Sequence, residues 1–219
     1  QDTTLVLADI PGLIEGAHSG VGLGTAFLRH IQRTRVLIHL LDGSASDPLA
    51  DYSQVNAEMA LFDPRLAEKP QVVAVNKMDL PPVAARWPDL ERELRRAGVT
   101  PLAVSVLEGQ GLEALLQAAS RQLAARRSQP QEEPDSVPTY TTEPSPLEFA
   151  VSRESGGDWR VRGKAIERAA AMTYWEYEEP IRRFQRLLER LGVDRSLREA
   201  GIRPGDMVHI GEYELEWSD

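Results

Sequence analysis

The residues with the clearest chemistry are Asn76, Lys77, Met78 and Asp79, which follow a valine-rich run at 72–75. In open α/β sheets, ligands bind beyond the carboxyl ends of the strands, so this position suits a site. A carboxylate at Asp79 can accept hydrogen bonds from the N1–H and the exocyclic amine of guanine. Adenine lacks that pair of donors, and such a site discriminates by roughly 10⁴-fold or more. Asn76 can tie the loop to neighbouring segments, and the Lys77 stem can lie over the base. The alternative is a loop in which Asn and Asp only satisfy the turn.

A second candidate segment consists of Asp9, Ile10, Pro11 and Gly12, after an apolar run at 4–8. A carboxylate at Asp9 can hold a water bound to Mg²⁺, and the Gly12 amide can approach a γ-phosphate closely because glycine has no side chain. The alternative is a proline-containing turn that leaves a strand. Gly12 lies 64 residues before Asn76, and this order and interval match the arrangement of GTP-binding proteins.

A third segment, Ser105, Val106 and Leu107, follows the run 102–104. Ser105 and the backbone amides after it occupy the place where GTP-binding proteins contact the guanine O6. The triplet has no meaning alone, but it is the third element in the expected order.

The elements that must position these segments alternate along residues 1–126. Short apolar runs predict strands at 4–8, 36–42, 72–76 and 102–105, and helical patterns occur at 25–34, 49–62, 90–97 and 112–126. Runs without polar alternation suit a parallel sheet that is covered on both faces. The alternation of strands and helices predicts a doubly wound α/β domain with right-handed crossovers.

Residues 127–147 contain five prolines and predict an extended linker. Residues 148–219 then predict a small α+β domain. Its expected elements are a hairpin across 155–158, a helix at 178–191, a short helix at 196–200 and a second hairpin split by Gly211.

Composition excludes several classes of protein. The net charge of −9 argues against broad electrostatic binding of nucleic acid. The chain has no cysteine, which excludes disulfides and thiolate metal sites and fits a reducing compartment. No run approaches the roughly 18 apolar residues of a membrane span, so none is expected. The chain begins at Gln1 and enters an apolar run at once, which we interpret as the start of a fragment.

Two parts of the chain resemble the Obg (CgtA) family of GTPases. Residues 9–31 are similar to the switch II segment and the following helix of that family. Residues 161–168, 172–173, 191–193 and 200–206 are similar to its C-terminal domain. The resemblance implies a P-loop-NTPase-type, mostly parallel sheet with its first strands missing, followed by the Obg C-terminal α+β domain.

The resemblance also implies what the residues do. Asp9, Ile10, Pro11 and Gly12 would lie beside the phosphates, with Asp9 reaching Mg²⁺ through water. Asn76, Lys77, Met78 and Asp79 would read guanine, with Ser105, Val106 and Leu107 as the last base-side contact. No catalytic side chain carries over, because Leu13 stands where many small GTPases place a water-orienting glutamine, which implies slow hydrolysis.

The family would further imply a monomeric, cytoplasmic GTPase that uses Mg²⁺ and binds GTP and GDP. It would act on the large ribosomal subunit, through ribosomal RNA and proteins, during assembly and growth control, with ppGpp as a further ligand. One departure matters: the 219 residues contain no Gly-x-x-x-x-Gly-Lys-Ser/Thr loop, and that loop supplies most of the phosphate contacts. The other hypothesis is therefore an inactive, truncated module that docks on the ribosome or on a protein.

Overall fold

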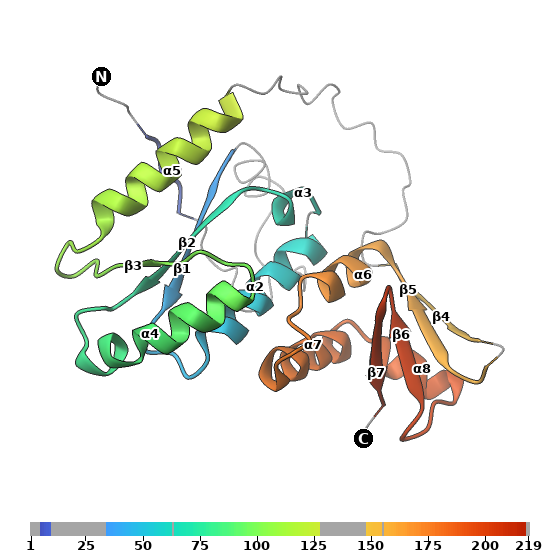
Figure 1. Cartoon of the computed structure of the whole chain (residues 1–219). Helices are drawn as coiled ribbons and strands as arrows, with labels where there is room; N and C mark the ends of the chain where they lie inside the picture. The colour runs from blue at the N-terminus through green and yellow to red at the C-terminus, as the bar shows by residue number, and fades with distance from the viewer. Residues whose placement is uncertain (1–4, 10–33, 63, 128–147, 155, 218–219) are drawn as a thin grey trace. The chain divides into compact units, whose positions relative to one another are not determined.

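The computed structural model describes residues 5–9, 34–62, 64–127, 148–154 and 156–217. These residues form two compact units (Figure 1). One holds the described residues of 1–52 and 68–139, and the other those of 53–67 and 140–219. The boundary between the units falls within one helix, since residues 53–67 group with the C-terminal part of the chain.

The first unit is built on a three-stranded parallel sheet. Its strands are β1 (Leu37–Asp42), β2 (Gln71–Asn76) and β3 (Leu102–Ala103), in the order β1-β2-β3. β1 and β2 pair in full register, so that Asp42 lies opposite Asn76 and the carboxyl ends of the two strands are level. The predicted parallel α/β sheet is confirmed, although β3 is shorter than expected.

Helices cover both faces of this sheet. α4 (Pro81–Arg96) and α5 (Leu112–Arg127) belong to this unit, as does the start of α2 (Pro48–Phe62), whereas the rest of α2 and the short α3 (Pro64–Ala67) group with the second unit. α5 packs Leu115 and Ala119 against Val72 and Ala74. In Figure 1, α4 and the start of α2 lie on the opposite side of the sheet from α5. Crossovers of this kind are those of a doubly wound fold.

Two predictions for the first unit were wrong. Residues 5–9 form no strand: Val6 is 92% exposed, and among the described residues no strand pairs with this segment. A strand needs such a partner for its backbone groups. α4 begins at Pro81 and not at 90, because proline is tolerated in the first turn of a helix, where its missing N–H has no intrahelical acceptor. The expected helix at 25–34 lies outside the described residues apart from Thr34, which is not helical.

The second unit contains a four-stranded sheet with the order β4-β5-β6-β7. The strands are β4 (Ala150–Arg153), β5 (Trp159–Arg162), β6 (Met207–Ile210) and β7 (Tyr213–Glu216). β4 and β5 form one antiparallel hairpin and β6 and β7 the other, as predicted, while β5 and β6 run parallel. This is the expected small α+β fold.

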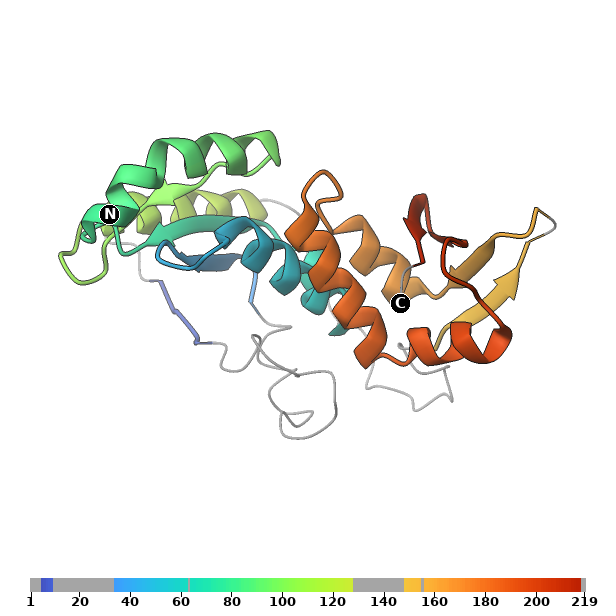
Figure 2. The ribbon, with the colours of Figure 1, turned by 90° about the horizontal axis from the view of Figure 1, so that it is seen from below.

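Three helices pack together against one face of that sheet (Figure 2). They are α6 (Lys164–Ala171), α7 (Glu178–Arg190) and α8 (Val193–Ala200). Phe184 of α7 and Leu197 of α8 share a buried core with Val161, Val208 and Ile210 of the sheet. α7 and α8 confirm the helical spacing read from the sequence. α6 was not predicted, although its buried residues Ala165, Ile166, Ala169 and Ala170 recur at helical spacing.

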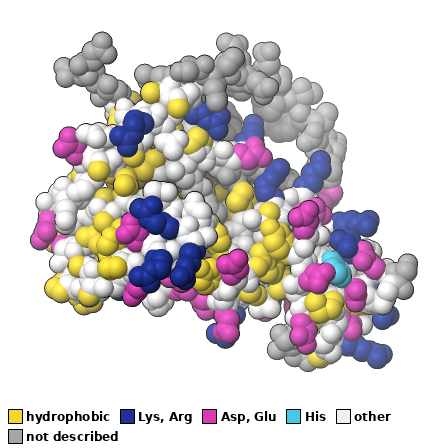
Figure 3. Space-filling model, in the orientation of Figure 1, with side chains coloured by type: hydrophobic (Ala, Val, Ile, Leu, Met, Phe, Trp, Pro, Cys, Tyr) yellow, Lys and Arg dark blue, Asp and Glu magenta, His cyan; other side chains and the backbone are white. Residues whose placement is uncertain are grey.

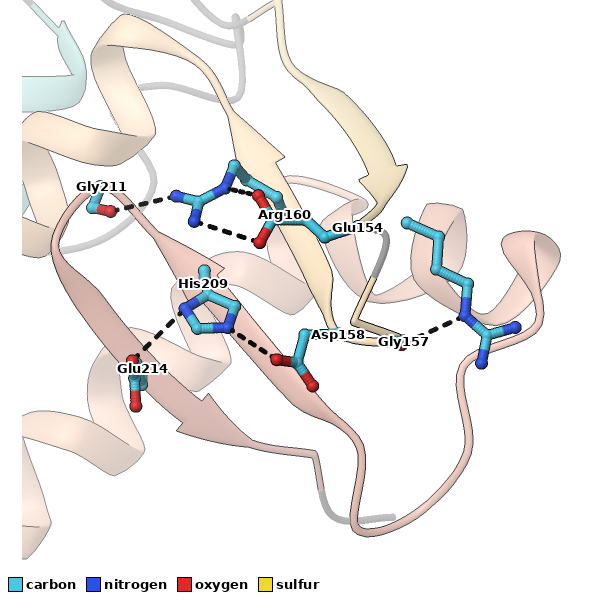
Figure 4. A network of polar contacts seen from close by, with 8 residues as sticks. Glu154, Gly157, Asp158, Arg160, His209, Gly211 and Glu214 are labelled. Carbon is cyan, nitrogen blue, oxygen red and sulfur yellow. Dashed lines mark hydrogen bonds and ion pairs between the residues drawn. The ribbon is translucent and has the colours of Figure 1, made fainter.

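The other face of the same sheet carries a polar network (Figure 4). The His209 ring lies between Asp158 and Glu214, with nitrogen–oxygen distances of 3.4 and 3.5 Å. Its register partner Arg160 bonds to Glu154. Of these contacts, the one between His209 and Asp158 joins the two hairpins. The described residues contain no group of three His, Cys, Asp or Glu side chains arranged to hold a metal ion.

Charge is mixed on the face drawn in Figure 3, where Asp and Glu side chains are interspersed with Lys and Arg. This distribution accompanies the net charge of −9 and gives that face no continuous basic field for a nucleic acid backbone. Of the helices that the structure describes, none combines the length and the hydrophobicity needed to pass through a bilayer.

Candidate functional site

The predicted base-side segments meet beyond the carboxyl ends of β2 and β3. The chain leaves β2 at Asn76 and turns through Lys77, while the segment after β3 continues to Ser105. Backbone bonds join the two. Met78 N donates to Val104 O at 3.1 Å, and Val104 N donates to Val75 O at 2.9 Å. Parallel pairing therefore brings together two segments that are far apart in the sequence.

The centre of the site is the contact between Ser105 and Asp79. The Ser105 hydroxyl, which is fully buried, donates to Oδ1 of Asp79 at 2.5 Å and accepts the Glu108 amide at 3.1 Å. A short O–H···O⁻ bond of this kind is charge-assisted and strong. It holds one carboxylate oxygen of Asp79, and Oδ2 makes no hydrogen bond among the described residues. A carboxylate fixed in this way can accept a pair of donors on one edge of a base.

Asn76 ties the two loops, as its residue type suggested. Its Oδ1 accepts the Val106 amide at 3.0 Å. The Val106 amide is thus engaged within the protein. Val106 and Leu107 are 53% and 85% exposed, so the loop that Asn76 holds presents two aliphatic residues to solvent.

Lys77 has a strained backbone and an anchored side chain. Its φ of +70° is the only positive value among the described residues other than glycine. Its Nζ donates to Oδ2 of Asp42 at 2.7 Å and to Oγ of Ser44 at 3.1 Å. Burial opposes ionisation of Asp42, but the hydrogen bonds from Lys77 and Ser44 outweigh it and lower the pKa of this carboxyl to about 2.

Asp42 and Ser44 were not among the residues singled out from the sequence. Asp42 was placed at the end of a predicted strand, but its role depends on the register of β1 against β2. The one available signal was that an acidic residue ends a buried strand beside the strand that carries Asn76 and Lys77.

Gly43 lets the ends of β1 and β2 approach. Its amide donates to Asn76 O at 3.1 Å. A Cβ at this position would lie 2.5 Å from Asn76 O and 2.5 Å from a methyl group of Val83. Only glycine fits without displacing α4 or the strand end, so the turn that presents Asp42 and Ser44 is closely constrained.

The phosphate-side segment is described only at Asp9. This residue is exposed and lies outside any strand, and among the described residues it makes no hydrogen bond or ion pair. Ile10, Pro11 and Gly12 lie outside the described residues. Mg²⁺ is usually held by one or two carboxylates together with waters and phosphates. The donor type of Asp9 fits that pattern.

A cavity of about 210 Å³ lies in the second unit, lined by aliphatic side chains such as Leu188, Leu197 and Val208 and by charged ones such as Asp194 and Arg198. It is smaller than the 300–1,000 Å³ that is usual for ligand pockets. Because Asp194 and Arg198 pair with each other at 3.1 Å, the loops after β2 and β3 are the better candidate on chemical grounds.

Two family models match parts of the chain. Residues 1–77 match the family described as 50S ribosome-binding GTPase. Residues 149–217 match a domain of unknown function, DUF1967. The "GTPase Obg" of Desulforudis audaxviator is 47% identical over an alignment of 225 positions, which covers all of this chain and 51% of that protein. The chain belongs to the Obg family.

Other Obg relatives give the same extent of match. The "GTPase Obg" of Chloroflexus aggregans is 46% identical over 98% of this chain and 50% of its own length. The "Probable GTP-binding protein OBGC1, chloroplastic" of Oryza sativa subsp. indica is 38% identical over all of this chain and 31% of its own length. The chain thus spans at most about half the length of these curated relatives.

Proposed function

We propose that the chain supplies the base-reading side of a guanine nucleotide site. Asp79 accepts the two donors of guanine, Ser105 fixes the Asp79 carboxylate, and Asn76 fixes the loop that carries Val106. The observation that carries the proposal is the 2.5 Å bond from Ser105 to Asp79, which orients the carboxylate at the carboxyl end of a parallel sheet. Membership of the Obg family supports the same assignment.

We further propose that the longer protein is a slow, Mg²⁺-dependent hydrolase of GTP. In this account Asp9 holds a metal-bound water and the Gly12 amide contacts the γ-phosphate. Mg²⁺, when bound, would neutralise charge on the phosphates. Leu13 cannot orient a water molecule, so hydrolysis is expected to be slow. GTP and GDP are the proposed ligands.

The domain limits that we propose are 1–126 for the partial GTPase domain, 127–147 for the linker and 148–219 for the Obg C-terminal domain. The second family match, which begins at 149, supports the start of the C-terminal domain. The partner that we propose is the large ribosomal subunit during its assembly, with ppGpp as a further ligand in growth control. The proposed state is a cytoplasmic monomer. One relative is named as chloroplastic, so location is a separate question from fold.

A second candidate function is a docking module without turnover. The observation in its favour is that the 219 residues contain no Gly-x-x-x-x-Gly-Lys-Ser/Thr sequence. Without the amides and lysine of that loop, the triphosphate would lose most of its contacts. In this case the chain would bind a partner and would hydrolyse nothing.

The two candidates are separated by measuring nucleotide binding and hydrolysis on two proteins. One is the 219-residue chain, and the other is an extended form in which a phosphate-binding loop and its preceding strand are supplied N-terminal to Gln1. We expect the extended form to bind GDP by calorimetry, to prefer it to ADP by roughly 10⁴-fold, and to hydrolyse GTP, while the chain alone does not turn over. An extended form that binds GDP and ADP equally would overturn the proposed function. Turnover by the chain alone would overturn the role that we give to the loop.

A further inference from the structure

We propose that Asp42 is a positioning residue for Lys77, and that it fixes the ammonium group so that the methylene stem of Lys77 forms a preformed wall for the base. The proposal rests on the proposed function, since it concerns the same site. It adds a residue of β1 to a site that otherwise draws on the loops after β2 and β3.

The register of the sheet makes this contact possible. Asp42 is the last residue of β1 and lies opposite Asn76, the last residue of β2. Lys77 is the next residue along the chain, so its side chain has only to cross from one strand end to the neighbouring one. It does so, and its Nζ reaches Oδ2 of Asp42 at 2.7 Å and Oγ of Ser44 at 3.1 Å.

The backbone conformation at Lys77 indicates that the surrounding structure directs its side chain towards Asp42. A φ of +70° is unfavourable for a side chain with a Cβ, and it persists only where the surroundings require it. The turn is closed by the Leu80 amide, which donates to Lys77 O at 3.0 Å. Both ends of the Lys77 side chain are therefore held, the Cα by the turn and the Nζ by Asp42 and Ser44.

The anchored ammonium determines which part of Lys77 a ligand can use. Two of its three N–H donors are engaged, and its charge is paired with Asp42. What remains for a planar base is the apolar stem. Lys77 would then act on the base through packing and would not act on the phosphates through its charge.

The exposure of the Lys77–Asp42 pair argues for a role in ligand binding and against one in the stability of the fold. The two side chains are 44% and 46% exposed, and exposed ion pairs contribute little to the stability of a fold. If a long side chain is already ordered before the ligand arrives, binding does not have to overcome the loss of its conformational entropy. For one such side chain the gain is about three- to tenfold in affinity.

The test uses Asp42→Asn in the extended form. The substitution keeps Oδ1, which accepts the Ser44 amide at 2.8 Å and holds the turn, and replaces Oδ2 with a group that cannot accept from Lys77. The matched control is Asp89→Asn, which breaks a more exposed ion pair with Arg92 on α4. Calorimetry then gives the affinities for guanosine, GDP and GTP.

We expect Asp42→Asn to weaken all three ligands by the same three- to tenfold, with no change for Asp89→Asn. Lys77→Met keeps an apolar stem but loses the ammonium group that Asp42 holds, so it should weaken binding by a similar factor. The double variant that combines Lys77→Met with Asp42→Asn should bind no more weakly than Lys77→Met alone. The proposal is overturned if Asp42→Asn behaves like Asp89→Asn, if its effect is additive with Lys77→Met, or if the loss grows with the number of phosphates.

A second measurement needs no ligand. NMR relaxation of the Lys77 ε-methylene in the 219-residue chain should show a restrained group, and in Asp42→Asn a mobile one. Equal mobility in the two proteins would overturn the proposal. If the unmodified extended form shows no preference for guanine ligands, the proposed function fails, while the relaxation result still decides whether Asp42 positions Lys77.

Discussion

The Ser105 hydroxyl donates a 2.5 Å hydrogen bond to Oδ1 of Asp79, although the two residues lie 26 positions apart in the sequence. Ser105 is fully buried, and its oxygen also accepts the Glu108 amide. One hydroxyl thus fixes both the orientation of the Asp79 carboxylate and the shape of the loop after β3. Every role that we assign to Asp79 depends on this contact.

Ser105→Ala is therefore expected to weaken GDP binding by the extended form tenfold or more, and to lower the stability of the first unit. The substitution leaves a carboxylate oxygen and an amide without their partner, a loss of about 1.5–3 kcal/mol for a bond to a charged group. Calorimetry and thermal unfolding measure the two effects. Ser152→Ala in the exposed strand β4 serves as the control and should change neither. Unaltered GDP affinity in Ser105→Ala would remove Ser105 from the site.

Gly111→Ala should destabilise the chain far more than Gly109→Ala. Both glycines have a left-handed backbone, with φ of +74° and +73°, so each substitution costs about 1–2 kcal/mol for the conformation alone. A Cβ at Gly111 would also lie 2.3 Å from Ala103 O, whereas nothing lies within 4 Å at Gly109. We expect at least about 2 kcal/mol of further loss from overpacking at Gly111, measured as the free energy of unfolding in urea. Equal losses would mean that the turn into α5 has room to relax.

His39 should make the stability of the first unit depend on pH. Its ring is partly buried beside Tyr52, and burial lowers the pKa of His39 to about 4, against weaker opposing effects from Gln71 and Asp51. Between pH 6.5 and about pH 4, the unfolded state binds a proton at this residue and the folded state does not. Stability must therefore fall as the pH falls through this window, by about 2–3 kcal/mol at most.

His39→Phe keeps the ring contact with Tyr52 and cannot be protonated. Urea unfolding of this variant and of the unmodified chain at pH 7, 5.5 and 4 tests the prediction. As the pH falls, the free energy of unfolding should decrease more in the unmodified chain than in the variant. If the two stability profiles run parallel, His39 is not buried in its neutral form.

The elements that could be predicted from sequence are those with continuous or strictly periodic apolar patterns. The runs that became β1 and β2, and the period of α7, belong to this group, because burial on both faces or on one face leaves a local signature. Asn76, Asp79 and Ser105 could be brought together in advance, because the carboxyl ends of neighbouring parallel strands meet at one edge of a sheet.

The contact between Lys77 and Asp42 could not be predicted in the same way. It needs the register of β1 against β2 and a left-handed backbone at a residue that is not glycine. Neither leaves a pattern in the sequence. The strand expected at 4–8 failed for a related reason: an apolar run becomes a strand only where another strand pairs with it, and none of the described residues does so.

The most direct test of the account is the nucleotide preference of Asp79→Asn in the extended form. Xanthine offers an acceptor where guanine offers its exocyclic amine, so an amide at position 79 should favour xanthine. We expect the unmodified protein to bind GDP far more tightly than xanthosine diphosphate, and the variant to reverse that order with its fold intact. If Asp79→Asn retains the preference for GDP, then Asp79 does not read the base, and the site that we describe is not a guanine site.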